Sequence, residues 1–179
     1  MQRDPEIQLL LDKQACTEVI YRLARAIDRC DADQLAQCFH KDATDDHGIF
    51  KGTASDFVTF VMPMLAGMIR TQHTICNVLV EVKGDDARSE SYFVAQHTLH
   101  GESGTQTEMF AAGRYLDTFS RRDGVWRLQH RHAVYDWNTA EAATSGWESE
   151  PMKSKLQRGM RGQADPSYAH FTALKDAPG

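Results

Sequence analysis

Residues 115–137 read YLDTFSRRDGVWRLQHRHAVYDW, and they have the pattern of a β-hairpin. Apolar and polar side chains alternate on both sides of Arg122-Asp123-Gly124, and an Asp-Gly pair is a strong signal for a tight hairpin turn. The sequence therefore predicts two long antiparallel strands, over Gln106–Arg121 and Val125–Trp137.

The same alternation continues upstream of this hairpin. It predicts strands over His73–Lys83 and Ala87–His100, which are separated by the turn signal Gly84-Asp85-Asp86. A shorter extended piece covers Ala43–Phe50. Strands of this length must form a curved sheet, because each strand twists along its length.

Helical periodicity precedes the strands. Apolar residues at spacings of three and four predict a helix over Pro5–Ile27, and Asp31 is a suitable N-cap for a second, short helix. A third helix begins near Ser55 and contains Pro63, which should kink or shorten it. Helices followed by a run of strands indicate the α+β class. We expect a cone-shaped α+β barrel, in which three N-terminal helices cover a strongly curved antiparallel sheet.

Two regions differ in composition. Residues 1–137 form the predicted cone domain, and residues 138–179 form a C-terminal extension that is rich in Ala, Ser, Gly and charged residues. This extension either packs on a neighbouring subunit or forms a lid over a pocket.

Composition restricts the class of protein. The chain has 179 residues, of which 41% are hydrophobic, and a net charge of −5, so it can build a core and lacks the basic surplus of nucleic-acid binders. No apolar run approaches the roughly 18 residues of a membrane span, and the N-terminus lacks a signal peptide, so we expect a cytoplasmic protein without nucleic-acid or membrane partners. The four cysteines have no CxxC spacing, which favours buried thiols over a zinc site.

Asp28 is the most informative carboxylate. It continues the apolar stripe of the first helix, so it faces the interior and needs a partner there. The alternative is that it caps the following helix. His73 and His97 lie near the ends of two predicted strands, where an imidazole can serve as a base or have a structural role.

The last strand carries His130, Arg131 and His132. Strict alternation places both histidines on the face of Leu128, which would point them into the core. Asp45-Asp46-His47 are contiguous on an extended piece, so they alternate faces and do not form a metal site. Dinucleotide, acyl-serine and P-loop motifs are missing, so we expect neither a metal nor a cofactor.

The order of several motifs resembles the SnoaL-like branch of the nuclear-transport-factor-2-like superfamily over about residues 7–137. These motifs are Ile27-Asp28-Arg29, Phe39-His40-Lys41-Asp42-Ala43, Gly52, Gln72-His73-Thr74, Gly113-Arg114-Tyr115 and the hairpin around Gly124. The pattern is similar to scytalone dehydratase, bile-acid 7α-dehydratase and hexachlorocyclohexane dehydrochlorinase.

The resemblance implies an Asp–His catalytic dyad made by Asp28 and His73. It also implies that His97 is a second acid or base, and that His130 or Arg131 supplies a cation. Several relatives carry a Lys or Tyr one turn before the dyad carboxylate, where this chain has Leu23. That group is therefore either missing or supplied elsewhere, for example by Tyr21, Tyr115 or Tyr135.

We therefore expect a cofactor-independent lyase that dehydrates a small hydrophobic, hydroxylated aromatic substrate or cleaves it by a retro-aldol-type reaction such as formaldehyde release. Such an activity would belong to the catabolism of aromatic compounds. An isomerase, a polyketide-type cyclase and a non-enzymatic ligand-binding protein are the alternatives. The side chains expected to bind the substrate are Tyr21, Phe57, Tyr115, His130, Arg131 and Trp147.

A homo-oligomer is expected from the apolar side chains assigned to the convex sheet face. These are Val78, Val80, Val82, Tyr92 and Val94. The dehydratase resemblance favours a trimer, and a dimer is the alternative.

Overall fold

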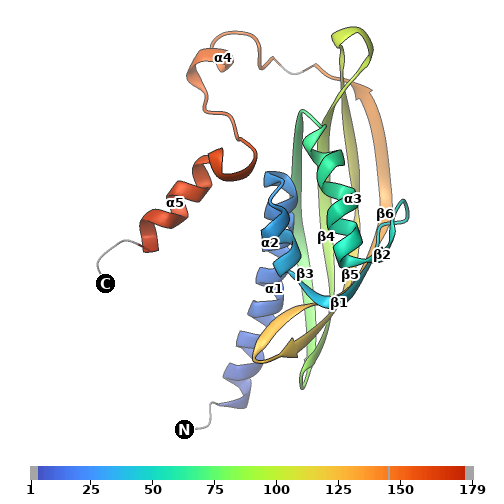
Figure 1. Cartoon of the computed structure of the whole chain (residues 1–179), viewed down its shortest axis with the longest axis vertical. Coiled ribbons are helices and arrows are strands. Elements are labelled where there is room, and N and C mark those ends of the chain that lie inside the picture. Colours follow the sequence, from blue (N-terminus) through green and yellow to red (C-terminus); the bar gives the residue numbers. More distant parts are fainter. Residues whose placement is uncertain (1–3, 145, 176–179) are drawn as a thin grey trace.

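The computed structural model describes residues 4–144 and 146–175, which fold into helices packed on a curved sheet (Figure 1). The α-helices and strands, in chain order, are α1 (Pro5–Arg29), α2 (Ala32–Gln37), β1 (Phe39–Asp46), β2 (Lys51–Thr53), α3 (Ala54–Ala66), β3 (Arg70–Lys83), β4 (Asp86–His100), β5 (Gln106–Arg122), β6 (Val125–Ala142), α4 (Met152–Lys155) and α5 (Pro166–Lys175). The predicted α+β class, with the helices α1–α3 ahead of the long strands, is confirmed.

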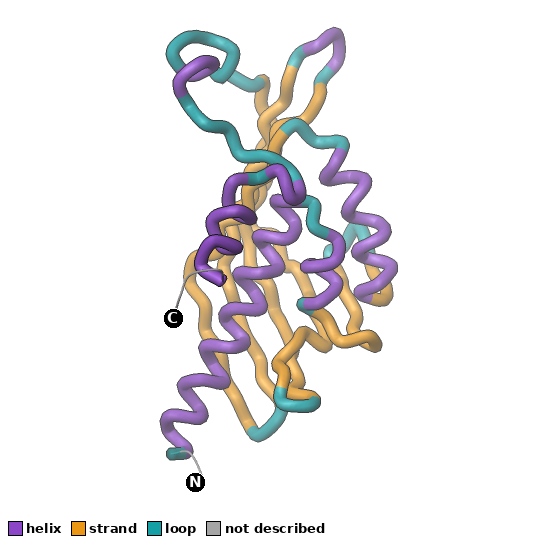
Figure 2. The backbone as a smooth tube through the Cα atoms, turned by 60° about the vertical axis from the view of Figure 1, so that its left-hand side comes forward, coloured by secondary structure: helices purple, strands orange, loops and turns teal. Residues whose placement is uncertain are grey.

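The sheet has six strands in the order β2-β1-β6-β5-β4-β3. Neighbouring strands are antiparallel except for β1 and β6, which run parallel. The helices α1 and α3 lie on the concave side of the sheet (Figures 1 and 2). The lower part of this concave side is filled by a cluster of buried apolar side chains from the three helices and the sheet.

Capping residues set the helix ends. The side chains of Asp4, Asp31 and Thr53 each accept a hydrogen bond from a backbone N–H in the first turn of α1, α2 and α3, respectively. The left-handed conformation of Cys30 ends α1. Pro63 lies inside α3, which ends three residues later at Ala66.

A β-bulge in β3 changes which side chains face the helices. Ile75 pairs with Phe93 but Val78 pairs with Ser91, so β3 has one extra residue and its alternation shifts. Val78, Val80 and Val82 therefore pack against the helical core. Their predicted position on the convex face is wrong, whereas Tyr92 is exposed.

A second bulge shifts the alternation of β6. Leu128 pairs with Phe119 and His130 pairs with Thr118, so Gln129 is the extra residue. Arg131 is therefore buried and His132 is exposed. The prediction that the two histidines share the face of Leu128 is wrong for this reason.

The C-terminal extension folds back over the domain. Strand β6 continues past Trp137 to Ala142, and the chain then leads through α4 to α5, which lies beside the upper part of α1 (Figure 2). The Tyr168 hydroxyl donates a hydrogen bond to Asp31, and the Arg25 guanidinium lies 4.3 Å from the centre of the Tyr168 ring. None of the helices in the described ranges is both long and apolar enough to span a membrane.

Candidate active site

Asp28 lies in the last turn of α1, where it meets the first residues of β3. Its Oδ2 accepts a hydrogen bond from the backbone N–H of His73 at 2.9 Å, and its Oδ1 lies 2.8 Å from the Nδ1 of the same residue. Both side chains are about nine-tenths buried. The alternative role as a cap of the next helix is not observed for Asp28, because Asp31 caps α2.

The hydrogen bond to Asp28 fixes the tautomer of His73. A carboxylate only accepts hydrogen bonds, so Nδ1 carries the hydrogen and the neutral ring keeps a lone pair on Nε2. Burial of the pair excludes water and strengthens the electrostatic interaction between the two groups. The arrangement gives His73 one nitrogen that can accept a proton and a carboxylate that stabilises the resulting positive charge.

His97 lies next to this pair on β4. The His73 and His97 rings are 5.3 Å apart and meet edge to face, and the buried Nδ1 of His97 has no hydrogen-bond partner within the described chain. Burial lowers the pKa of His97 to about 4; the neighbouring His73 and Arg161 act in the same direction, and the Asp28 carboxylate acts against them. His97 is therefore neutral at neutral pH, so it can donate a hydrogen bond but is a poor reservoir of protons.

Asp28 lines two cavities. A large one, of about 1040 Å³, is lined by the first residues of β3 and β5, the last residues of β4 and β6, and the C-terminal extension. His97 and Trp147 are among its lining residues. A small one, of about 250 Å³, lies between α1 and β3 and is lined by His73, Tyr21 and Ile75. Asp28 thus lines both cavities, whereas His73 lines the small one.

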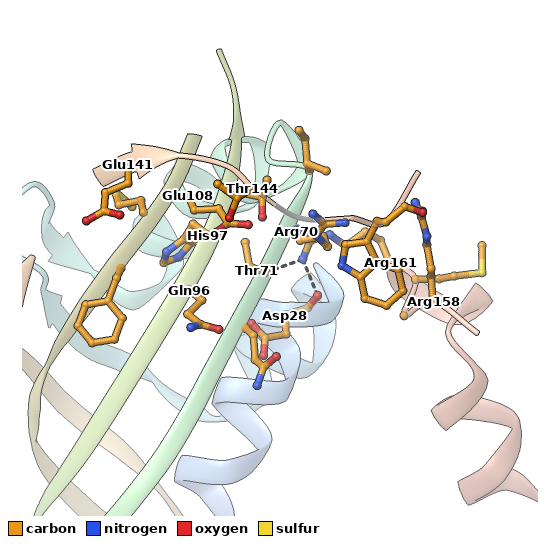
Figure 3. Close-up of a pocket in the computed structure, with 18 of the residues that line it drawn as sticks. Asp28, Arg70, Thr71, Gln96, His97, Glu108, Glu141, Thr144, Arg158 and Arg161 are labelled. Atoms are coloured by element: carbon orange, nitrogen blue, oxygen red, sulfur yellow. Dashed lines mark hydrogen bonds between the residues drawn. The ribbon is translucent and has the colours of Figure 1, made fainter. Parts of the chain in front are cut away.

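The large cavity has a more polar lining than the sequence predicts. Arginines from α1, β3 and the extension lie around it together with two glutamates, as Figure 3 shows for most of them. Its apolar lining includes Ile69, Met109, Phe110, Trp147 and Met160. The cavity therefore suits a molecule that combines an apolar ring with polar or charged groups.

Four of the predicted substrate-binding residues lie away from both cavities. Phe57 is buried in the helical core and stacks on His47. Tyr115 and Arg131 are buried deeper in the cone. The Nδ1 of His130 lies 2.7 Å from the hydroxyl of Thr44, on the opposite side of β6 from Arg131.

Arg131 forms a buried ion pair with Asp117. Two N–H···O hydrogen bonds of 2.8 and 2.7 Å join the two side chains, and the guanidinium lies 3.9 Å from the centre of the Tyr115 ring. Although burial alone would lower it, the pKa of Arg131 is raised by the Asp117 carboxylate. This geometry gives Arg131 a structural role in the cone.

Asp45 and His47 bond to each other at the concave face. Within the described ranges, no group of three or more His, Cys, Asp or Glu side chains is arranged to hold a metal ion. These two residues, with the stacked ring of Phe57, instead form a second carboxylate–imidazole contact inside the cone.

Sequence reasoning missed Arg161 and Thr71. The Arg161 guanidinium donates hydrogen bonds to the backbone carbonyl oxygen of Asp28 and to the hydroxyl of Thr71 at 2.7 Å (Figure 3). It also donates one to the backbone carbonyl oxygen of Leu65 at 3.4 Å. Nothing in the local sequence of the extension indicates this contact, because Arg161 lies 133 residues from Asp28 along the chain.

Comparison with known proteins identifies the family. The model of the SnoaL-like domain matches residues 8–132, which is most of the cone domain. The chain belongs to the SnoaL-like family. A comparison with curated proteins finds no match to this SnoaL-like chain.

Solved structures share its fold. A candidate scytalone dehydratase from Novosphingobium aromaticivorans is 20% identical, with a TM-score of 0.65 over 73% of this chain and 87% of that protein. A type 3 hexachlorocyclohexane dehydrochlorinase from Novosphingobium barchaimii is also 20% identical, with a TM-score of 0.66 over 76% and 94% of the two chains. A Nostoc punctiforme protein with a cystatin-like fold is 20% identical, with a TM-score of 0.59 over 76% and 96%. At these identities the likeness establishes the architecture of the SnoaL-like cone.

Proposed function

We propose that this SnoaL-like protein is a cofactor-independent acid–base lyase whose catalytic base is His73. The observation that carries the proposal is the buried pair of Asp28 and His73, which two hydrogen bonds join. The bond to Nδ1 places the hydrogen on that atom and leaves Nε2 free to accept a proton. A positioned imidazole of this kind contributes about 10² to 10⁴-fold to a proton-transfer step.

In a dehydration, Nε2 of His73 removes a proton from a carbon next to the one that carries the hydroxyl group. The electrons of the C–H bond form the new C=C bond, and the C–O bond breaks. The imidazolium, which Asp28 stabilises, then returns its proton to the departing hydroxide, which leaves as water. The elimination is redox-neutral and therefore needs no oxidant or reductant.

The same pair can drive a retro-aldol cleavage. Here Nε2 of His73 removes the O–H proton of a hydroxymethyl group, and the O–H electrons form the C=O bond of formaldehyde. The C–C bond breaks, and its electron pair stays on the adjacent carbon. That carbanion then takes the proton back from His73. The choice between the two reactions depends on the substrate, because both need only one base and a group that stabilises negative charge.

The structure changes the role that we assign to His97. With a pKa of about 4, its charged form is scarce at neutral pH, so we do not assign it as the acid. Instead, a neutral N–H of His97 donates a hydrogen bond to a substrate oxygen at the wall of the large cavity.

The proposed substrate is a small ring-containing molecule with a hydroxyl group. The ring would lie against the apolar side chains of Met109, Phe110 and Trp147 in the large cavity. Because His73 lines the small cavity, the reacting carbon would have to lie at the edge near Asp28, which lines both cavities. Elimination is also the chemistry that the names of two structural relatives describe, since a dehydratase expels water and a dehydrochlorinase expels hydrogen chloride.

A panel of hydroxylated aromatic and alicyclic compounds tests the proposal. Turnover is expected for the wild-type chain on at least one compound, and it should be lost in His73→Ala and in Asp28→Asn. Turnover that survives both changes contradicts the role of the pair. Thermal melts of the same variants identify a purely structural pair, which would show a large loss of stability with no substrate turned over by the wild type.

A further inference from the structure

The Arg161 side chain reaches the meeting point of three elements beside the proposed site. Its hydrogen bonds go to the end of α1 at Asp28, the end of α3 at Leu65 and the start of β3 at Thr71. Asp28 and His73 come from two of these elements, so Arg161 braces the backbone on both sides of the pair. The residue also lines the large cavity (Figure 3).

The segment around Arg161 is held in place by its own contacts. Asp165 is buried and accepts hydrogen bonds from the backbone N–H groups of Met160 and Ser167, and it lies 3.2 Å from the Arg29 side chain. Burial works against the charged form, yet these hydrogen bonds and the Arg29 charge hold the pKa of Asp165 well below its usual range. The guanidinium of Arg161 is thus presented by a folded segment.

Among the residues that the structure describes, the positive charge of Arg161 has no carboxylate partner. Every acceptor bonded to it is a neutral oxygen, and no Asp or Glu in the described ranges forms an ion pair with it. By contrast, Arg29 pairs with Asp165, and Arg158 pairs with Glu148 at 3.0 Å. A guanidinium has five N–H donors, and the three hydrogen bonds of Arg161 leave two donors for a ligand.

Other groups at the cavity wall complement a ligand with an anionic oxygen. The guanidinium groups of Arg70 and Arg158 lie 5.8 and 5.1 Å from the centre of the Trp147 ring, so positive charge and an aromatic side chain occur together at this wall. His97 contributes a buried imidazole with an unpartnered Nδ1. These groups and Arg161 line the same cavity.

We propose that Arg161 binds an anionic oxygen of a ring-containing substrate. This oxygen belongs to a carboxylate or a phenolate group. This inference rests on the proposed lyase function and narrows its substrate class to anions. It also makes the C-terminal extension part of the site. Negative charge that develops on the substrate during proton removal is stabilised by the same contact.

Binding of model anions tests this inference without a known substrate. Isothermal titration calorimetry compares benzoate and 4-nitrophenolate with the neutral benzamide. The wild type is expected to bind at least one anion more tightly than benzamide. Arg161→Gln should raise the Kd for that anion about 10- to 100-fold and leave the Kd for benzamide unchanged. The anion that responds distinguishes a carboxylate from a phenolate site. Lys153→Gln is the matched control, since Lys153 is an exposed cation of the same extension.

Two results overturn the inference. One is the absence of any preference of the wild type for an anion. The other is an equal loss of anion and benzamide binding in Arg161→Gln, which means that Arg161 only anchors the extension. Arg161→Lys, which keeps the charge, should retain part of the preference. The fate of the lyase proposal is separate, because anion binding by the wild type and Arg161→Gln is measured without turnover, whereas the lyase proposal is judged by turnover in His73→Ala and Asp28→Asn.

Discussion

The buried pair of Arg131 and Asp117 provides the sharpest stability prediction. Their side chains are 1% and 0% exposed, and two short hydrogen bonds join them. Asp117→Asn keeps the shape of the side chain but leaves a buried guanidinium without its counter-charge. Breaking a buried ion pair in this way costs about 3–5 kcal/mol of unfolding free energy.

For a chain of this length, a loss of that size lowers the melting temperature by about 6–20 °C. Urea unfolding followed by circular dichroism measures the change directly, and the slope of the transition should stay the same because the surface exposed on unfolding does not change. A double variant that replaces both side chains by apolar ones, Asp117→Leu with Arg131→Met, should lose less stability than Asp117→Asn alone.

The same experiment tests the structural role of Arg131. If Asp117→Asn lowers stability by less than about 1 kcal/mol, the pair is solvated or weak, and the description of the cone interior is wrong. If it leaves stability intact but removes anion binding, Arg131 belongs to the ligand site after all, and the assignment of that role to Arg161 loses its basis.

Three further predictions follow from single contacts. Gly113→Ala should destabilise the protein by about 1–3 kcal/mol or more in urea unfolding, because a Cβ there would lie 2.0 Å from the backbone oxygen of Val134. His97 takes up a proton near pH 6.5 when unfolded but only near pH 4 when folded, so stability should fall as the pH drops from about 6.5 to about 4, and His97→Gln should flatten this dependence. A thiol reagent at pH 8 should modify the exposed Cys76 and leave Cys38 unmodified, since burial raises the pKa of Cys38 to about 11; rapid modification of Cys38 would contradict its burial.

Local sequence signals were sufficient to predict the order of the helices and the long strands along the chain. The Asp123-Gly124 turn occurs where the hairpin pattern places it, between β5 and β6, and Asp31 caps α2. A polar partner for Asp28 could also be anticipated, because a carboxylate on the apolar stripe of α1 must find one inside the fold; it was the family resemblance that pointed to His73.

The bulges in β3 and at Gln129 of β6 could not be predicted from the pattern. Strict alternation assumes one residue per step on each strand, and an extra residue at Gln129 exchanges the sides of Arg131 and His132. In β3 the same effect turns Val80 toward the helices. Both errors concern the direction of side chains, while the existence of the strands was predicted correctly.

Long-range contacts of the C-terminal extension were also beyond sequence reasoning. Its short helices have weak apolar patterns, and Arg161 meets Asp28 and Thr71 only after the chain has passed over the ends of the strands. Composition could therefore suggest a lid or an interface, but not which side chain would reach the site. The polar lining of the large cavity has the same origin, since much of it comes from this extension.

Chemical rescue of His73→Ala is the most direct test of the central claim. On a substrate found with the compound panel, this variant should lose about 10² to 10⁴-fold in kcat/KM, and added imidazole should restore part of the rate in proportion to its concentration. Asp28→Ala, with its base still present, should gain nothing from imidazole. Wild-type rates in His73→Ala, or a loss that imidazole leaves unchanged in a folded variant, would show that the proton is removed by another group.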